Sequence, residues 1–422
     1  MRKITTPPIP GPAGAECQPA RSPVWETLET YARGEIQQFV QRLLEEEVDD
    51  LLGRSKSARR TEASAPGYRN GHAKPRKLAL SNGTITIARP RVRNLEARFA
   101  SRLLPLFKRR TEEVGALLPE LYLHGLSLGD FELALRGLLG DGAPLSASSI
   151  VRLKQDWHRQ YTTWARRSLA DLELVYLWAD GVYVKAGLEQ EKAALLVLIG
   201  ATATGEKVIL AVESGHREST ESWGAVLRDL KARGLSAPKL TIADGHLGIW
   251  SALGTVYPSS AEQRCWNHKL RNVLDVVAKK HQPEVKLALQ AIASAETRPE
   301  CERLKRAFEK ANALAHPKAI ARLERDWERM TSYYAFPQEH WKHLRTTNII
   351  ESPFAAVRLR TGAAKRFKKV ENATALIWKV LLVVEQHFRK LNAPHLTAEV
   401  YADVKYCDGV RAVNTAREQV AA

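Results

Sequence analysis

Three apolar runs follow one another with only short links between them, at residues 174–179, 193–199 and 208–212. Links of this length join neighbouring antiparallel strands, so the runs predict an antiparallel meander. A helical segment, residues 220–231, separates them from a fourth run at residues 239–243. A strand that is reached through a helical crossover is expected to run parallel to a neighbour. The segment therefore predicts an α/β fold with a mixed sheet of three antiparallel strands plus parallel strands.

This order of strands and helix is that of a ribonuclease-H-like core. The residues that follow it, 283–334, carry apolar side chains at helical spacing, and Pro283, Pro299 and Pro317 each stand where a first helical turn would begin. They predict an all-α insertion. Two later helices, residues 349–360 and 373–391, are expected to return to the sheet.

The first and fourth runs are each followed by the tripeptide Ala-Asp-Gly, which contains Asp180 and Asp244. If the two strands are parallel neighbours, their carboxyl ends bring these aspartates side by side. Neighbouring carboxylates resist joint ionisation unless a cation neutralises them, and oxygen ligands suit magnesium or manganese. The alternative is that Asp-Gly, a favoured turn dipeptide, marks two turns and nothing more.

A third carboxylate, Glu351, is expected to begin a strongly basic helix. The cationic residues that follow it are Arg358, Arg360, Lys365, Arg366, Lys368 and Lys369. A single acid at the start of such a stretch suits a position beside DNA phosphates. The alternative is an acid that complements the dipole of its helix.

The balance of charge indicates a polyanionic partner, because 64 Lys and Arg against 47 Asp and Glu leave a net charge of +17. Displacing counterions from a phosphate backbone favours association with such a chain. Acidic membrane surfaces are the main rival, but the longest apolar runs are far too short to span a bilayer. Residues 1–23 have no continuous apolar segment and predict a loose arm rather than a signal peptide. We therefore expect a cytoplasmic, nucleoid-associated protein that binds double-stranded DNA, with no membrane or small-molecule substrate.

The N-terminal part is expected to bind DNA. Residues 25–52 predict an amphipathic helix, a candidate dimer contact, and residues 54–93 form a basic segment around one strand-like alternation at 78–87. Three helices are expected at residues 111–124, 127–139 and 146–164, with Ser127 and Ser146 as N-caps. They fit a helix-turn-helix or, equally, a plain helical connector. The predicted DNA contacts here are Arg69, Lys74, Arg76, Arg89, Arg91, Arg152 and Lys154.

At 422 residues the chain is long enough for several domains. We predict an arm and helix over residues 1–66, a basic DNA-binding region over 67–165, and the first part of the catalytic core over 171–282. The α-helical insertion follows over 283–345, the final helices of the core over 346–395, and a loosely structured tail over 396–422.

Several blocks of the sequence resemble those of Mutator-type bacterial insertion-sequence transposases. They are Tyr68-Arg69-Asn70-Gly71-His72, Asp180-Gly181-Val182-Tyr183-Val184-Lys185, Asp244-Gly245-His246, Gln263-Arg264-Cys265-Trp266-Asn267-His268-Lys269-Leu270-Arg271-Asn272 and Thr346-Thr347-Asn348-Ile349-Ile350-Glu351-Ser352. They occur in the family's order between about Gly67 and Asn392. The resemblance implies a ribonuclease-H-like domain with a DDE triad at Asp180, Asp244 and Glu351 and a helical insertion before the glutamate. The family continues Glu-Ser-Leu-Asn, whereas Pro353 and Phe354 stand here, which puts in doubt any role of that asparagine.

Cys265 and His268 match a further motif of this family. Two ligands alone cannot complete a tetrahedral zinc site, and no other Cys or His pair nearby has suitable spacing. We therefore expect a structural or DNA-facing role for them. Four cysteines lie far apart without a Cys-x-x-Cys pair, which predicts neither a disulfide framework nor a zinc ribbon.

The expected function is that of a DDE transposase. Such an enzyme binds terminal inverted repeats, hydrolyses phosphodiester bonds to expose 3′-OH ends and transfers them to target DNA, using two Mg²⁺ (or Mn²⁺) ions per active site. Lys185 and Arg264 join the basic residues after Glu351 as predicted DNA contacts. A homodimer is expected because two element ends must be bound. The alternatives are a ribonuclease-H-like junction nuclease and a non-catalytic regulator derived from a transposase, although all three carboxylates are retained.

Overall fold

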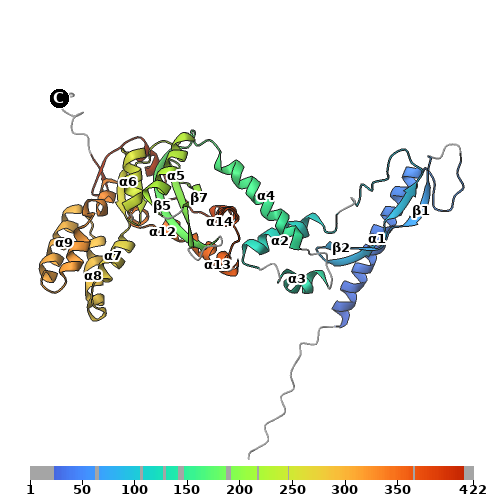
Figure 1. The fold of residues 1–422 in the computed structure, drawn as a ribbon, viewed down its shortest axis with the longest axis horizontal. Helices are drawn as coiled ribbons and strands as arrows, with labels where there is room; N and C mark the ends of the chain where they lie inside the picture. The colour runs from blue at the N-terminus through green and yellow to red at the C-terminus, as the bar shows by residue number, and fades with distance from the viewer. Residues whose placement is uncertain are drawn as a thin grey trace, which may run out of the picture. The chain divides into compact units, whose positions relative to one another are not determined.

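The computed structural model describes residues 23–61, 66–104, 108–126, 130–140, 147–186, 192–215, 218–245, 247–364 and 366–412. These residues fall into two compact units (Figure 1). The first comprises the described parts of Met1–Leu118 and Gly129–Ala147, and the second those of Pro119–Leu128 and Ser148–Ala422. Helix α2 (Glu112–Leu123) contributes residues to both units.

The first unit combines a long helix with two small antiparallel sheets. Helix α1 (Pro23–Leu52) confirms the predicted helix and starts two residues before it. Strand β1 (Tyr68–His72) pairs with β4 (Pro90–Arg93), and β2 (Arg76–Leu80) pairs with β3 (Gly83–Ile87). The single strand-like alternation predicted at 78–87 is therefore wrong: the chain reverses after Leu80 and forms a hairpin. Ile85 and Ile87, on one face of β3, pack against Leu44 of α1.

Three predicted helices are confirmed as α2, α3 (Phe131–Leu139) and α4 (Ala147–Ala165). The expected caps Ser127 and Ser146 lie outside the described residues. In the second unit, the Tyr122 ring of α2 packs against Trp157 of α4, with 6.0 Å between the ring centroids. Because these helices are divided between two units, the helix-turn-helix stays a prediction.

A five-stranded mixed sheet forms the centre of the second unit. Its elements are β5 (Leu174–Lys185), β6 (Lys192–Thr202), β7 (Lys207–Gly215), α5 (Thr220–Ala232), β8 (Leu240–Ala243), α6 (Leu247–Val256) and β9 (Ala261–Arg264). The strand order is β7-β6-β5-β8-β9. The first three strands pair antiparallel, β8 runs parallel to β5, and β9 runs parallel to β8. The predicted meander and its parallel fourth strand are confirmed.

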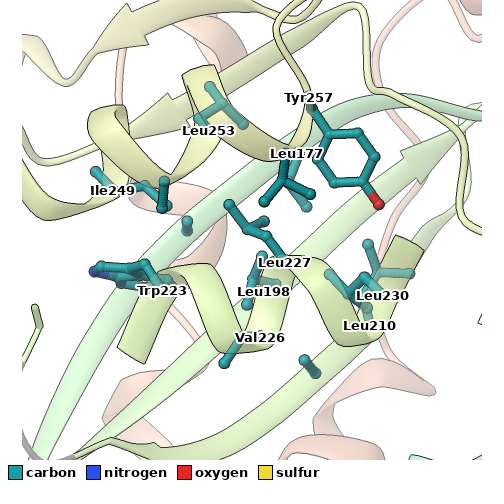
Figure 2. Packing of buried hydrophobic residues seen from close by; sticks show 14 of the residues in the cluster. Leu177, Leu198, Leu210, Trp223, Val226, Leu227, Leu230, Ile249, Leu253 and Tyr257 are labelled. Carbon is teal, nitrogen blue, oxygen red and sulfur yellow. The ribbon is translucent and has the colours of Figure 1, made fainter. Parts of the chain in front are cut away.

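Helices α5 and α6 cover one face of this sheet. Figure 2 shows Trp223 and Leu227 of α5 and Leu253 of α6 packed over Leu177 and Leu198 of the strands. Burying each such side chain contributes roughly 1.5–3 kcal/mol, so this layer is a main source of the unit's stability. The other face carries Tyr176, whose hydroxyl lies 2.8 Å from His340 Nδ1.

The residues after β9 are almost entirely helical. Helix α7 (Trp266–Leu274) is followed by η1 (Lys279–His281), α8 (Gln282–Ala293), α9 (Arg298–Asn312), α10 (Pro317–Glu324), η2 (Trp327–Met330) and η3 (Ser332–Ala335). The three prolines stand in the first turns of α8, α9 and α10 as predicted. Helices α8 and α9 pack on each other, and α8 also contacts α7 (Figure 1). The all-α character predicted for residues 283–334 is confirmed.

The C-terminal elements differ from the prediction in two respects. After η4 (Gln338–His340) and α11 (Trp341–Leu344), the helix expected at 349–360 is broken into α12 (Asn348–Glu351) and α13 (Phe354–Ala364), because Pro353 between them has no N–H to donate. Helix α14 (Val370–Glu385) packs against β7. The loose tail expected from residue 396 is wrong as far as residue 411, because this part of the chain contains α15 (His395–Tyr401) and the pair β10 (Tyr406–Cys407) and β11 (Val410–Arg411). Among the described helices, none is long and apolar enough to cross a membrane.

Candidate active site

Asp180 lies inside a strand and not at its end. Strand β5 continues through Gly181 to Lys185, with Asp180 opposite Val197 and Gly181 opposite Leu196 of β6. The prediction that Asp180 ends this strand is therefore wrong, and so is the alternative that Asp180-Gly181 is a turn. The parallel pairing of β5 with β8 ends at Ala179 and Ala243. Asp180 and Asp244 are thus the first residues beyond the last parallel pair, on adjacent strands.

Asp244 and Gly245 lie in the irregular segment that follows β8. Gly245 has φ +106, and a Cβ there would lie 2.1 Å from Arg264 Nε. Arg264 Nε donates a 3.3 Å hydrogen bond to the Asp244 carbonyl oxygen. The glycine therefore lets the arginine side chain reach the backbone that carries Asp244.

Glu351 is the last residue of the one-turn helix α12, which packs against β5 and β6. The prediction that it begins a long basic helix is therefore wrong. Thr347 Oγ1 donates a 2.6 Å hydrogen bond to Glu351 Oε1. His268 Nδ1 lies 3.8 Å from the same oxygen. One oxygen of Glu351 is thus oriented by a threonine four residues earlier in the chain.

The three predicted carboxylates form one electrostatic cluster. Burial, together with the negative charges of Asp244, Glu218 and Glu351, raises the pKa of Asp180 to about 8. A 2.7 Å hydrogen bond from the Gly181 N–H to Asp180 Oδ1 stabilises the charged carboxylate and so lowers this pKa in part. The structure therefore brings Asp244 and the distant Glu351 close enough to Asp180 for each of their charges to raise its pKa.

Glu218 is a fourth acid of this cluster that the sequence analysis missed. A Cβ at position 181 would lie 2.3 Å from Glu218 Oε1, so the absence of a side chain at Gly181 makes room for this carboxylate. Burial and the Glu218 carboxylate also raise the pKa of Tyr183 to about 12. The signal in the sequence was Gly181, which we interpreted only as a turn residue.

A buried ion pair joins the helical insertion to the end of β9. Arg264 Nη1 lies 2.9 Å from Asp326 Oδ2, and the two side chains are 9% and 11% exposed. Asp326 also accepts a 3.0 Å hydrogen bond from Arg329 Nη1. Beside this pair is a cavity of about 540 Å³ whose lining includes Asp244, His268 and Arg325. The insertion therefore forms one wall of a cavity that opens next to a candidate catalytic aspartate.

Cys265 is the N-cap residue of α7 and is fully buried. Its Sγ accepts a hydrogen bond from the Thr347 N–H at 3.3 Å and lies 3.2 Å from Thr347 Oγ1, whose proton is donated to Glu351. His268, one turn further on, lies 3.5 Å from Thr347 Oγ1. The motif thus contacts the segment that carries Glu351.

The predicted DNA contacts differ widely in exposure. Arg76, Arg89 and Lys154 are half-buried, and Lys365 lies outside the described residues. The contacts exposed to solvent are Lys74, Arg91, Arg152, Lys185, Arg358, Arg366, Lys368 and Lys369. Three others are held by protein groups. Arg69 pairs with Asp49 and Glu45, Arg264 pairs with Asp326, and Arg360 is buried with its guanidinium 3.8 Å from the centroid of the Tyr122 ring. These three side chains are not presented to a DNA backbone in this structure.

Four of the exposed cations gather at the far end of β5. The Phe367 N–H donates a 2.9 Å hydrogen bond to the Lys185 carbonyl, so the segment after α13 is bound to the strand that carries Asp180. We name Lys185, Arg366, Lys368 and Lys369 the basic cluster. It continues from the candidate site along the same strand.

Comparison with known proteins identifies relatives over most of the chain. The profile described as "Transposase, Mutator family" matches residues 20–390. The transposase for insertion sequence element IS6120 of Mycolicibacterium smegmatis is 44% identical over 293 residues, which are 69% of this chain and 91% of that protein. The transposase for IST2 of Acidithiobacillus ferrooxidans is 41% identical, over 66% of this chain and 95% of its own. The transposase for ISRM5 of Rhizobium meliloti is 30% identical, over 85% of this chain and 88% of that protein.

Proposed function

The chain belongs to the Mutator family of transposases, and on that basis we propose that it is a DNA transposase with Asp180, Asp244 and Glu351 as its catalytic carboxylates. It binds the terminal inverted repeats of an insertion sequence, hydrolyses phosphodiester bonds and transfers the exposed 3′-OH ends to target DNA. The observation that carries this proposal is the shared electrostatic cluster of these three acids, which come from three distant parts of the chain.

The strand order supports a ribonuclease-H-like catalytic unit. Three antiparallel strands, a helical crossover and two parallel strands occur here in the order β7-β6-β5-β8-β9. In this arrangement Asp180 and Asp244 each stand directly after the last parallel pair of β5 and β8, and α12 carries the glutamate to the same sheet. The helical insertion occupies the interval before the glutamate.

The donor set fits divalent cations. Asp180, Asp244 and Glu351 offer only carboxylate oxygens, the ligands that Mg²⁺ and Mn²⁺ prefer. The raised pKa of Asp180 shows that its charge is unfavourable without a counter-charge, and a bound cation would provide one. Two such ions per site, when bound, stabilise charge on the attacking and the leaving oxygen of a phosphodiester.

The remaining groups position DNA and the carboxylates. Thr347 fixes one oxygen of Glu351, and Arg264 holds the backbone at Asp244. The basic cluster is suited to bind backbone phosphates along the strand that leads to Asp180. In the first reaction, water attacks phosphorus and the bond to the 3′ oxygen breaks, which leaves a 3′-OH. In the second, that 3′-OH attacks a target phosphodiester, and one phosphodiester bond replaces another.

Double-stranded DNA is thus the partner, and we expect a homodimer because two element ends are joined in one reaction. Helix α1 is the candidate dimer contact, since Leu28, Tyr31 and Phe39 expose 50–65% of their surface. A net charge of +17 favours a position on the nucleoid in the cytoplasm.

The test is metal-dependent nicking of a labelled DNA fragment that carries an element end. Asp180→Asn, Asp244→Asn and Glu351→Gln are each expected to lower the rate at least about a hundredfold, because amides are poor ligands for Mg²⁺ and even outer-shell changes can cost that much. Binding of end DNA should be nearly unchanged. Glu221→Gln, an exposed acid in the first turn of α5, is the matched control and should retain activity.

Substantial Mg²⁺-dependent nicking by any of the three variants would disprove the assignment of the site. Pre-cleaved ends separate a transposase from a junction nuclease, because only the transposase joins them to target DNA. A wild-type chain that binds ends but neither nicks nor joins them would be a regulator.

A further inference from the structure

A second group of metal-ligating side chains shares Glu351 with the proposed catalytic triad. The sulfur of Cys265, a ring nitrogen of His268 and a carboxylate oxygen of Glu351 all lie within 4.8 Å of one another. The sequence supplied only the first two, which cannot complete a zinc site. The fold adds a third ligand from a segment more than eighty residues away, because Thr347 of that segment bonds to Cys265.

We propose that Cys265, His268 and Glu351 form an inhibitory site for a zinc-type ion, which takes Glu351 from the catalytic carboxylates when it is occupied. The inhibitory part of this inference rests on the proposed function, whereas the binding site does not. Thiolate, imidazole and carboxylate are together a zinc donor set, and three protein ligands leave the fourth tetrahedral position for water. Mg²⁺ avoids thiolate ligands. Zinc would therefore bind Glu351 together with Cys265 and His268, whereas Mg²⁺ would bind it together with the two aspartates.

The geometry requires a modest contraction. Zinc bonds of about 2.3 Å to sulfur and about 2.0–2.2 Å to nitrogen and oxygen bring tetrahedral ligand atoms to within roughly 3.3–3.8 Å of one another. The cluster therefore has to close by about 1 Å. His268 and Glu351 are 21% and 33% exposed, so solvent borders part of each side chain, and small rotations of the two can close this distance to the buried sulfur. His268 also lines the cavity beside Asp244, which provides a path for the ion.

Thr347 supports the ligand sulfur and the ligand oxygen at once. Its N–H donates to Cys265 Sγ while its hydroxyl donates to Glu351 Oε1, and a thiolate that receives a hydrogen bond is a stabilised ligand. When zinc binds, the Cys265 thiol releases its proton to solvent and the sulfur keeps the electron pair that it donates to the metal. The negative charge of Glu351 is then shared with zinc and is no longer fully available to a cation held by Asp180.

Binding is tested with Co²⁺ as a spectroscopic substitute on the metal-free full-length chain. The expected result is one Co²⁺ per chain with the absorption band of a thiolate ligand, which added Zn²⁺ removes. Cys265→Ser and His268→Gln should each weaken binding at least about tenfold. Cys301→Ser, a buried free cysteine in α9, is the matched control and should bind as the wild type does. A band of equal strength in wild type and Cys265→Ser, or no band in wild type, overturns the proposal.

Inhibition is tested by adding Zn²⁺ to Mg²⁺-dependent nicking. Each variant is compared with its own rate in Mg²⁺ alone, and Cys265→Ser and His268→Gln should require at least about tenfold more Zn²⁺ for half-inhibition. Equal sensitivity in wild type and both variants overturns the inhibitory role. Asp180→Asn separates the two hypotheses, because it should bind Co²⁺ normally although it does not nick. An inactive wild type with an intact Co²⁺ site would contradict only the proposed function.

Discussion

Thr347 is the residue on which the orientation of Glu351 depends. It is fully buried, and its hydroxyl bonds to the carboxylate while its N–H bonds to Cys265. A carboxylate at the end of a one-turn helix has few backbone constraints of its own. The threonine therefore determines which oxygen of Glu351 faces the aspartates.

Thr347→Val tests this role, because it keeps the shape of the side chain and removes the hydroxyl donor. We expect nicking to fall by about 10–100-fold at low Mg²⁺ and to recover partly at high Mg²⁺, as for other outer-shell partners of metal ligands. A Mg²⁺ titration of the nicking rate measures this. Thr346→Val, at the neighbouring position, is the control. Identical Mg²⁺ curves for the two variants would show that the hydroxyl does not position Glu351.

His343 makes the stability of the second unit sensitive to acid. Burial, with smaller contributions from Lys207 and Lys342, lowers the pKa of His343 to about 4 although a bond to Asn392 opposes the shift. Nε2 of His343 lies 3.3 Å from Asn392 Oδ1, the contact that favours the protonated ring, and accepts from the Asn392 N–H at 3.4 Å only when it is unprotonated. Neutral His343 therefore contributes stability above its ordinary pKa of about 6.5, and this contribution is lost as the pH falls toward 4.

His343→Gln should consequently flatten the loss of stability between pH 6.5 and pH 4. Urea unfolding at several pH values measures the free energy of unfolding of wild type and variant. His387→Gln, which replaces an exposed histidine at the end of α14, is the matched control and should follow the wild type. Parallel curves for wild type and His343→Gln would refute the explanation.

At the scale of elements, the insertion is attached to the sheet through charges rather than through apolar packing alone. Asp326 adopts a left-handed conformation with φ +61 and receives both Arg264 and Arg329. Arg264 in turn bonds to the backbone at Asp244. A displacement of the loop after α10 would therefore be transmitted to the end of β8.

Asp326→Asn removes the charge while an amide still tolerates the left-handed backbone. Breaking a buried pair from one side typically costs about 3–5 kcal/mol, because the remaining charge is left without a partner. We expect the free energy of unfolding, measured with urea, to fall by an amount near the lower of these values. Glu328→Gln breaks the exposed pair with Arg298 and should cost less than about 1 kcal/mol. Equal losses in the two variants would mean that the Arg264 pair is not the attachment.

At the scale of the whole molecule, the net charge of +17 is available to DNA only in part. Arg264 and Arg360, both predicted as DNA contacts, are turned inward, whereas the basic cluster remains exposed. The salt dependence of binding therefore reports how many exposed cations meet phosphates, and not how many are present in the sequence.

Lys368→Ala combined with Lys369→Ala should weaken the binding of end DNA and lower the slope of log K against log salt concentration by about 2, or about 1 for each lost phosphate contact. Binding measured over a salt series gives this slope. The control is Lys279→Ala combined with Lys280→Ala, which changes an exposed lysine pair in η1. This double variant should lower the slope less. If both double variants have the wild-type slope, the basic cluster does not contact the backbone.

The strands β5 to β8, their pairing and the helical insertion were predictable because their signals are local, whereas β9, with the sequence Ala-Glu-Gln-Arg, has no apolar run and was not predicted. Apolar runs, short links and first-turn prolines lie within a few residues of the elements that they define. Asp180 and Asp244 followed from the same pattern, since each stands directly after an apolar run. The predicted alternation at 78–87 failed because a hairpin and a single strand have the same period of two.

Only the tertiary structure determined how distant side chains meet. Glu218 beside Asp180, Arg264 turned to Asp326, and Glu351 next to Cys265 and His268 depend on how α5, the insertion and α12 pack on the sheet. No spacing within the chain encodes such contacts, because burial and electrostatic pairing act through space between segments whose separation in sequence is large. The sequence by itself therefore determined the elements and the acids at their ends, and packing decided which neighbours those acids have.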